Sequence, residues 1–189
     1  MKVSVLSILS KTLVATAIAA LCGVLTVTHV SCGKRTADRT NVENNITEPQ
    51  DSINKISFSL PDINGNIVSA EDVWSKNKIT IIDFWASWCG PCRSEMPNLV
   101  RLYDTYHDKG LEIIGVSLDE DKQQWETAID KLGIKWLQLS DLKGWENAVA
   151  RQFDVNSIPY TIIVDNKGQT LATDLRGESL QTFIAERLD

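Results

Sequence analysis

The sequence predicts an α/β protein, a sandwich of helices around a central mixed β-sheet. Apolar stretches of strand length alternate with helical patterns over residues 78–153, which is typical of parallel strands joined by helices. Two further strands, at 160–164 and 170–173, flank a turn at 165–168 and predict an antiparallel hairpin. An amphipathic helix over 178–188 closes the chain.

The folded region is predicted to begin with another hairpin. Residues 56–60 alternate between apolar and polar types, and the turn at 64–66 leads to a short apolar pair at 67–68. Ser69 can cap a short helix that runs to Trp74, because a serine side chain accepts hydrogen bonds from free N–H groups at a helix start.

The longest apolar stretch, residues 78–85, is expected at the centre of the sheet. A helix should follow over 91–109, with Pro97 inside it and Gly110 at its end. The patterns that come next predict a strand, a helix, a short strand and a helix, over residues 111–118, 119–132, 136–139 and 145–153.

Residues 1–31 are predicted to be an export signal. Lys2 gives a positive start, residues 13–27 are apolar or small, and no charged residue stands between Lys11 and Cys32. A small residue followed by Cys32 resembles a bacterial lipoprotein signal, in which the cysteine is lipidated and becomes the mature N-terminus. The alternatives are an uncleaved membrane anchor and a simple signal with an incidental cysteine.

Residues 32–55 are polar and lack an apolar period, which predicts a flexible tether and leaves 56–189 as the folded domain. The hydrophobic share of 43% and the charged share of 23% suit a globular domain. The formal charge of −6 offers no basic surface, so we expect no nucleic-acid partner.

Cys89 and Cys92 stand where an apolar strand gives way to a helix, in the run Asp-Phe-Trp-Ala-Ser-Trp-Cys-Gly-Pro-Cys at 83–92. N–H groups at a helix start favour a thiolate, and a disulfide that closes so small a loop stabilises a fold little. The spacing therefore predicts thiol–disulfide exchange. A structural zinc site needs about four ligands, and outside the signal only His107 could join the cysteines, so no metal is expected.

The run Phe-Trp-Ala-Ser-Trp-Cys-Gly-Pro-Cys-Arg at 84–93 resembles a thioredoxin active site, and Ser-Ile-Pro-Tyr-Thr at 157–161 resembles the cis-proline loop of that fold. The extra helix and strand before this loop, the N-terminal hairpin, Glu-Met-Pro at 95–97 and the export signal resemble the TlpA/ResA-like branch. Its members are membrane-tethered extracytoplasmic thiol–disulfide oxidoreductases. The resemblance covers residues 56–189 and implies a thioredoxin-like sandwich with an α/β insertion before the cis-proline loop.

The resemblance also implies roles for the residues around the disulfide. Cys89 would attack a substrate disulfide, and Cys92 would resolve the mixed disulfide. Asp83 would be a buried acid with a raised pKa that relays a proton to or from Cys92; the alternative is an edge position that faces water. Gly90 and Pro91 would set the loop and its redox poise, since Gly-Pro is the pair of reducing thioredoxins.

Five residues would contact the substrate chain: Trp88, Gly90, Pro91, Ile158 and Pro159. Trp88 would form an exposed apolar rim, and Ile158 and Pro159 would flank the cysteines if their peptide bond is cis. A trans proline that opens a strand is the alternative. Trp85 is expected to support the loop, and core or insertion packing is expected for the remaining tryptophans, Trp74, Trp125, Trp136 and Trp145.

The expected function is that of a tethered thiol–disulfide oxidoreductase in a bacterial cell envelope, which mainly reduces disulfides in exported proteins. The resemblance implies no bound cofactor and a membrane thiol-reductant carrier as electron donor. One alternative is a thiol peroxidase, although neither Cys89 nor Cys92 has the Pro-x-x-x-Thr-x-x-Cys context of related peroxide-reducing folds. The other is a binding module that uses the scaffold without turnover.

Overall fold

The structure is a computed structural model of the 189-residue chain, and it describes residues 55–189. The predicted signal 1–31, the lipidation candidate Cys32 and all of the predicted tether except Lys55 lie outside the described residues. The expected domain boundaries therefore stay predictions. Within residues 55–189, no helix combines the length and the apolar composition that a bilayer crossing requires.

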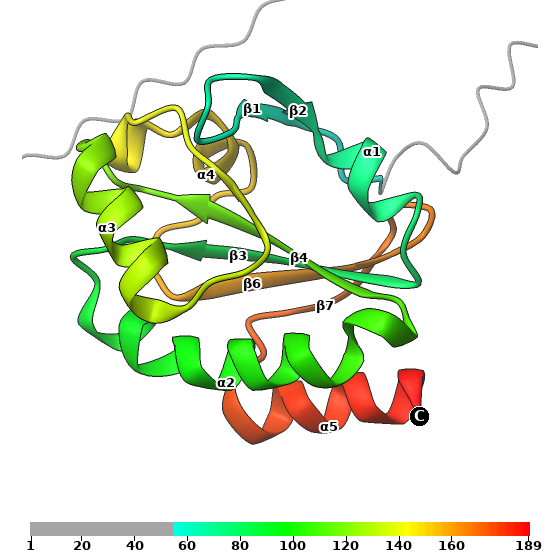
Figure 1. Ribbon diagram of the computed structural model, residues 1–189. Coiled ribbons are helices and arrows are strands. Elements are labelled where there is room, and N and C mark those ends of the chain that lie inside the picture. The colour runs from blue at the N-terminus through cyan, green and yellow to red at the C-terminus, as the bar shows by residue number, and fades with distance from the viewer. Residues whose placement is uncertain (1–54) are drawn as a thin grey trace, which may run out of the picture. The chain divides into compact units, whose positions relative to one another are not determined.

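A five-stranded mixed sheet forms the middle layer (Figure 1). β3 is its central strand, with β4 parallel on one side and β6 antiparallel on the other. β5 continues the sheet in parallel beyond β4, and β7 pairs antiparallel with β6. The strands span Ile79–Trp85 (β3), Leu111–Ser117 (β4), Leu137–Leu139 (β5), Tyr160–Asp165 (β6) and Thr170–Thr173 (β7). The predicted mixed sheet is confirmed.

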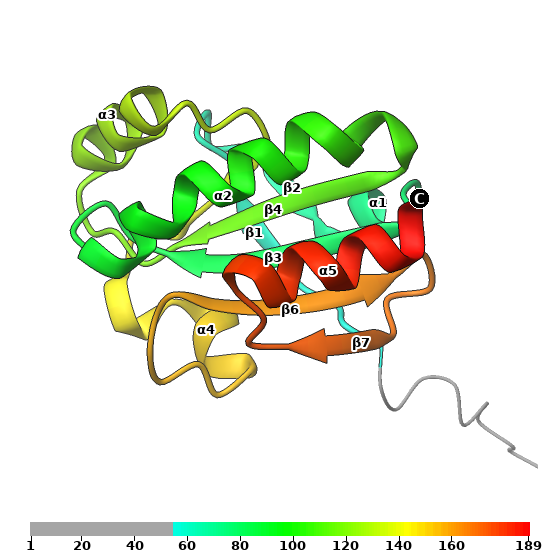
Figure 2. The same ribbon diagram turned by 90° about the horizontal axis from the view of Figure 1, so that it is seen from below.

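Helices and a hairpin cover the two faces of this sheet. α2 (Gly90–Tyr106) and α5 (Gly177–Leu188) lie side by side on one face, as both views show (Figures 1 and 2). The other face carries α1 (Ala70–Trp74), α4 (Ala148–Gln152) and a two-stranded hairpin (Figure 1). Every residue of β3 is buried, which explains its continuous apolar sequence.

The N-terminal hairpin forms as the sequence predicts. β1 (Ser59–Pro61) and β2 (Ile67–Ser69) pair antiparallel, and the Ser69 side chain accepts a 3.3 Å hydrogen bond from the N–H of Glu71 at the start of α1. A single bridge between Asp62 and Leu139 attaches the hairpin to the β5 edge of the sheet.

Glycines end two of the helices at the predicted places. α2 continues into a 3₁₀ turn, η2 (His107–Lys109), and Gly110 follows with φ of 107°. A Cβ on Gly110 would lie 2.9 Å from Cγ of Lys78, so both the backbone and the space favour glycine. α3 (Lys122–Leu132) begins after Asp121, whose side chain accepts from the N–H of Gln124, and it ends at Gly133.

The single helix predicted over 145–153 is wrong, because two short helices occupy this segment. η3 (Gly144–Glu146) is separated from α4 by Asn147, which has φ of −51° and ψ of 126° and is therefore not helical. The Asn147 side chain accepts hydrogen bonds from the N–H groups of Val149 and Ala150 and donates to Asp141. Its capping bonds start a new helix and break the apolar pattern there.

Candidate active site

The two cysteines lie at the junction of β3 and α2. β3 ends at Trp85, a short loop follows, and Cys89 is the N-cap of α2, with proline in the first turn of the helix. A disulfide joins Cys89 and Cys92, whose Cα atoms are 5.3 Å apart. The N–H of Cys92 points at Sγ of Cys89 over 3.1 Å, so an orphan donor of the helix start faces the sulfur on which negative charge would develop.

The two sulfurs differ in their access to solvent. Cys89 is 5% exposed and Cys92 1% exposed, which is the order the sequence predicts. Gly90 and Pro91 between them are exposed, and Trp88 beside Cys89 is 52% exposed. An incoming disulfide can therefore approach Cys89 past these residues, while Cys92 lies behind it.

A second loop, 69 residues further along the chain, lies against Cys89. The Ile158–Pro159 peptide bond is cis, and the carbonyl oxygen of Ile158 is 3.8 Å from Sγ of Cys89. β6 begins directly afterwards at Tyr160, whose ring packs against that of Phe84 on the neighbouring β3. The antiparallel pairing of β3 and β6 thus brings Ile158 and Pro159 beside the cysteines, and their contact with a substrate chain stays a prediction.

Asp83 is buried inside the sheet with 2% of its surface exposed, and the edge position weighed as an alternative is wrong. Burial raises the pKa of this carboxyl to about 7; the negative charge of Glu95 adds to the rise and the positive charge of Arg176 opposes it. Such a group can gain or lose a proton near neutral pH. Its pKa near neutrality suits proton transfer, and the relay to Cys92 stays a prediction.

Asp119 holds the loop that carries the cysteines, a role that the sequence analysis missed. It accepts hydrogen bonds from the N–H and hydroxyl of Ser87, at 3.0 and 2.5 Å, and from the hydroxyl of Ser117 at 2.7 Å. A signal was present: β3 and β4 are parallel with Trp85 opposite Ser117, so the residues just after both strands meet at one edge of the sheet.

Two more supports come from outside the predicted site. Oε1 of Gln138, on β5, accepts a 2.9 Å hydrogen bond from the indole N–H of Trp85. Oε1 of Glu95, one helical turn after Cys92, accepts a 2.7 Å hydrogen bond from the N–H of Gly177 and so joins α2 to the start of α5. Trp85 is fully buried and supports the loop, as expected.

Trp145 departs from its expected place in the packing of the insertion. It lies in η3, is 45% exposed, and its ring faces that of Trp88 with centroids 6.3 Å apart. Trp74, Trp125 and Trp136 are buried as expected. The sequence alone did not separate Trp145 from these three, because its contact with Trp88 joins residues 57 positions apart.

No trio of metal-binding side chains comes together in the part of the chain that the structure describes. The site brings together the Cys89–Cys92 pair, the helix-start N–H groups and the acid in the sheet. These groups can form and open a disulfide and can move the proton that each step requires.

The fold and the site define a thioredoxin-like thiol–disulfide oxidoreductase. Comparison with protein families agrees: the model of the AhpC/TSA family matches residues 54–171, more than half of the chain, and the protein belongs to this family.

The relatives point to the same enzyme class. The chain is 29% identical over 132 residues to the thiol-disulfide oxidoreductase ResA of Bacillus thuringiensis subsp. konkukian, a match that covers 70% of this chain and 73% of ResA. It is 33% identical over 112 residues to the thiol:disulfide interchange protein HelX of Rhodobacter capsulatus, where the match covers 59% of this chain and 60% of HelX.

Solved structures share the fold at similar identity. A thiol-disulfide oxidoreductase from Bacteroides fragilis matches with a TM-score of 0.66 and 34% identity, covering 70% of this chain and 98% of that one. The thioredoxin domain of a thiol-disulfide oxidoreductase from Bacteroides vulgatus matches with a TM-score of 0.64 and 32% identity, covering 71% and 94%. The expected ResA-like class, the thioredoxin-like fold and the assignment as an enzyme are confirmed.

Proposed function

We propose that this enzyme is tethered to the extracytoplasmic side of a membrane and reduces disulfides in exported proteins. The observation that carries the chemistry is the Cys89–Cys92 disulfide at the start of α2, with the N–H of Cys92 directed at Cys89. The Gly-Pro pair between the cysteines supports reduction as the direction of electron flow. The N-terminal sequence pattern supports the extracytoplasmic location and, with it, exported proteins as substrates.

The reaction begins from the dithiol form. The Cys89 thiolate attacks one sulfur of the substrate disulfide, so a Cys89–substrate bond forms, and the other substrate sulfur leaves as a thiolate that takes up a proton. Cys92 then gives its proton to a base, a role that we assign to Asp83 because its pKa is about 7, and attacks Cys89. The second substrate thiol is released, and two electrons have passed from the enzyme to the substrate.

Regeneration of the dithiol requires two electrons from outside. A membrane thiol-reductant carrier with two thiols would supply them by the same exchange in reverse. One carrier thiolate attacks the Cys89–Cys92 disulfide and forms a mixed disulfide. The second carrier thiol then attacks the bonded carrier sulfur, which leaves the carrier as a disulfide and this enzyme as a dithiol. In this scheme the N-terminal segment, through Cys32 or an uncleaved anchor, holds the domain near that carrier.

The reduction potential tests the direction of electron flow. After equilibration with glutathione buffers, we expect a value near ~−270 mV, that of a reducing thioredoxin, whereas a value near ~−120 mV would assign an oxidant. A disulfide-reduction assay accompanies it: Cys89→Ser should be inactive, and Cys92→Ser should accumulate the mixed disulfide that wild-type enzyme resolves.

The membrane tether has its own test. In a bacterial host, the full-length protein should fractionate with membranes, and mass spectrometry of its N-terminal peptide should show a lipid on Cys32. Cys32→Ala should release the protein or stop its processing. Wild-type protein in the membrane fraction with an intact, unlipidated N-terminus would assign a signal anchor, and recovery of wild-type protein in the cytoplasm would refute the proposed location.

A thiol peroxidase remains the competing activity, since the AhpC/TSA family model matches the chain. Peroxide consumption by the reduced enzyme distinguishes the two: we expect turnover of disulfides and none of hydrogen peroxide. Rapid peroxide turnover that depends on Cys89 would reverse the assignment.

A further inference from the structure

A pocket of about 380 Å³ adjoins the active-site loop on the side of the insertion. Trp88, the residue before Cys89, lines it together with Trp145 of η3, and the acids of the β4–α3 connection complete the wall. The pocket therefore lies within a few residues of any chain whose cysteine is bonded to Cys89, because an extended chain advances about 3.3 Å per residue.

The aromatic wall is exposed to an unusual degree. Trp88 and Trp145 are two of the four large hydrophobic side chains that are exposed among residues 55–189. They come from distant parts of the sequence, yet their rings meet at 6.3 Å with an angle of 53° between their planes. Large apolar rings that gather at the surface beside a reactive group mark a binding site.

The charged wall of the same pocket is acidic throughout. Asp119 is occupied by Ser87 and Ser117, and Asp121 caps α3. Glu120, between them, is exposed and forms no hydrogen bond or ion pair within the described residues. A Cβ on Gly144 would lie 2.4 Å from Oε1 of Glu120, which places this carboxylate directly over the start of η3, next to Trp145.

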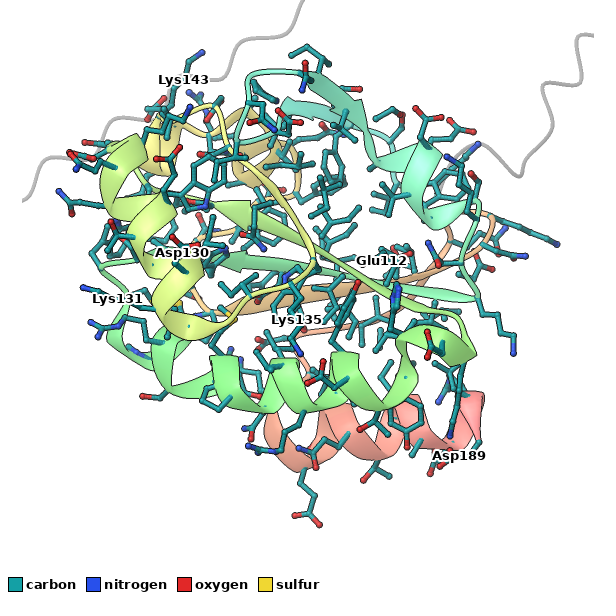
Figure 3. The ribbon with its side chains drawn as sticks, in the orientation of Figure 1. Glu112, Asp130, Lys131, Lys135, Lys143 and Asp189 are labelled. Carbon is teal, nitrogen blue, oxygen red and sulfur yellow. A yellow bond between two sulfur atoms is a disulfide. The ribbon has the colours of Figure 1, made fainter. Side chains whose placement is uncertain are left out.

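Basic side chains lie near the pocket but do not line it. Lys143 lies on the loop that leads into η3, and Lys131 lies on α3 (Figure 3). Lys131 lines a different cavity. A metal ion is also a poor occupant, since no metal-binding group of three side chains occurs in residues 55–189. Two indole faces and one unpaired carboxylate are the groups that bind an alkylammonium or guanidinium ion.

We propose that this pocket binds a lysine or arginine side chain of the substrate polypeptide, close to the cysteine that reacts with Cys89. Glu120 pairs with the cation, and Trp88 and Trp145 cover its apolar stem and its charged face. The inference rests on the proposed function for its substrate class and adds the feature that selects among substrates. The insertion thus contributes specificity, while the cysteines contribute the chemistry.

Single-turnover reduction of matched peptide disulfides tests the pocket. The full-length reduced protein, in detergent, is mixed with peptides that differ only in an arginine, glutamine or glutamate beside the cysteine. We expect the arginine peptide to react about fivefold faster than the glutamine peptide, as one exposed ion pair and one cation–π contact allow. The glutamate peptide should be the slowest.

The ratio of the arginine to the glutamine rate is compared within each variant, so a general loss of activity cancels. Glu120→Gln and Trp145→Ala should each bring the ratio down to about two or less. Asp130→Asn is the matched control, because Asp130 is an exposed acid on α3 outside the pocket (Figure 3). A wild-type ratio of one, or an unchanged ratio in Glu120→Gln, overturns the proposal.

A binding measurement separates the pocket from the reaction. The same peptides with serine in place of cysteine cannot react, and their binding is followed through the indole N–H signals in NMR spectra. The arginine peptide should bind more tightly than the glutamine peptide and shift the signals of Trp88 and Trp145. If no peptide disulfide is reduced but this preference is present, the proposed function fails and the pocket stands; if the preference is absent, the pocket proposal fails.

Discussion

Two acidic side chains near the disulfide lie in opposite environments, one buried in the sheet and one exposed in a surface pocket. On the inner side, Asp83 lies in the central strand, and burial raises its pKa to about 7. On the outer side, Glu120 lies in an open pocket beside Trp88 and Trp145. An acid enclosed by the sheet is suited to proton transfer, whereas an unpaired carboxylate at the surface is suited to meet a ligand.

The two tryptophans around the loop repeat this contrast. Trp85 is fully buried, and Gln138 accepts the hydrogen bond of its indole. Trp88, three residues later, is 52% exposed. The loop is therefore held at its buried end by Trp85 and is exposed to solvent at Trp88.

The largest effect should come from truncating the buried tryptophan. Trp85→Ala removes a fully enclosed ring and is expected to lower the free energy of unfolding by about 3–5 kcal/mol. Trp88→Ala, the exposed counterpart, should change it by about 0.5 kcal/mol or less. Urea unfolding of the oxidised proteins measures both. Equal losses of unfolding free energy in Trp85→Ala and Trp88→Ala would show that the two tryptophans contribute equally to stability, against this prediction.

The next effect concerns the pH dependence of stability. The carboxyl of Asp83 has a pKa of about 7 in the folded protein, against an ordinary value of 3.8. Well below pH 4 the carboxyl is protonated in both states. Above pH 7 it is ionised in both states, but only in the folded state is the charge buried. Folding stability should therefore fall as pH rises from about 4 to about 7, by on the order of a few kcal/mol.

Asp83→Asn should remove this decline, because the amide does not titrate. Urea unfolding of both oxidised proteins at a series of pH values measures the difference, and wild-type stability that stays level over this window would contradict it. In the reduced protein, the same substitution should slow resolution of the mixed disulfide and flatten its pH dependence near 7.

A smaller loss is expected at the edge that joins the two sides. Asp119→Ala leaves the N–H and hydroxyl of Ser87 and the hydroxyl of Ser117 without their acceptor, which should cost about 2–3 kcal/mol of unfolding free energy. Asp121→Ala, which removes only the cap of α3, is the matched control at about 1 kcal/mol. Thermal and urea unfolding compare the pair, and a larger loss in the control would refute the loop-anchoring role of Asp119.

The smallest effect should follow a change on the open side. A Cβ on Gly90 would meet no atom within 4 Å, so Gly90→Glu should fold normally. The added carboxylate beside Cys89 should disfavour the thiolate and slow its alkylation at pH 7 by about twofold to threefold. Alkylation rates of the reduced proteins measure this, with Gly90→Ala as the neutral control. An equal slowing in Gly90→Ala would assign the effect to the side chain's bulk.

Most of the fold could be predicted because its elements carry local signals. The apolar run of β3, the cap at Ser69 and the glycines at 110 and 133 each report a structure that a few neighbouring residues decide. The helix over 145–153 was predicted wrongly. Asn147 breaks it by accepting hydrogen bonds from the N–H groups of Val149 and Ala150 as the cap of α4, and the apolar spacing used for the prediction does not reveal such a cap.

The same division holds for the active site. Cys89, Cys92 and Pro159 were found because their motifs are short and contiguous. Asp119 and Gln138 were missed, since each supports a loop more than thirty residues away in the sequence. The contact between the rings of Trp88 and Trp145 was missed for the same reason, because the residues next to each tryptophan in the sequence do not indicate that the two rings meet.

The sequence by itself determined the order of strands and helices, the reactive pair of cysteines and the class of chemistry, because these follow from periodicity, turn residues and spacing within one segment. Only the tertiary structure decided the protonation behaviour of Asp83, the anchoring of the loop and the pocket beside Trp88. Each of these depends on which distant side chains surround a group, and that surrounding exists only once the sheet has assembled.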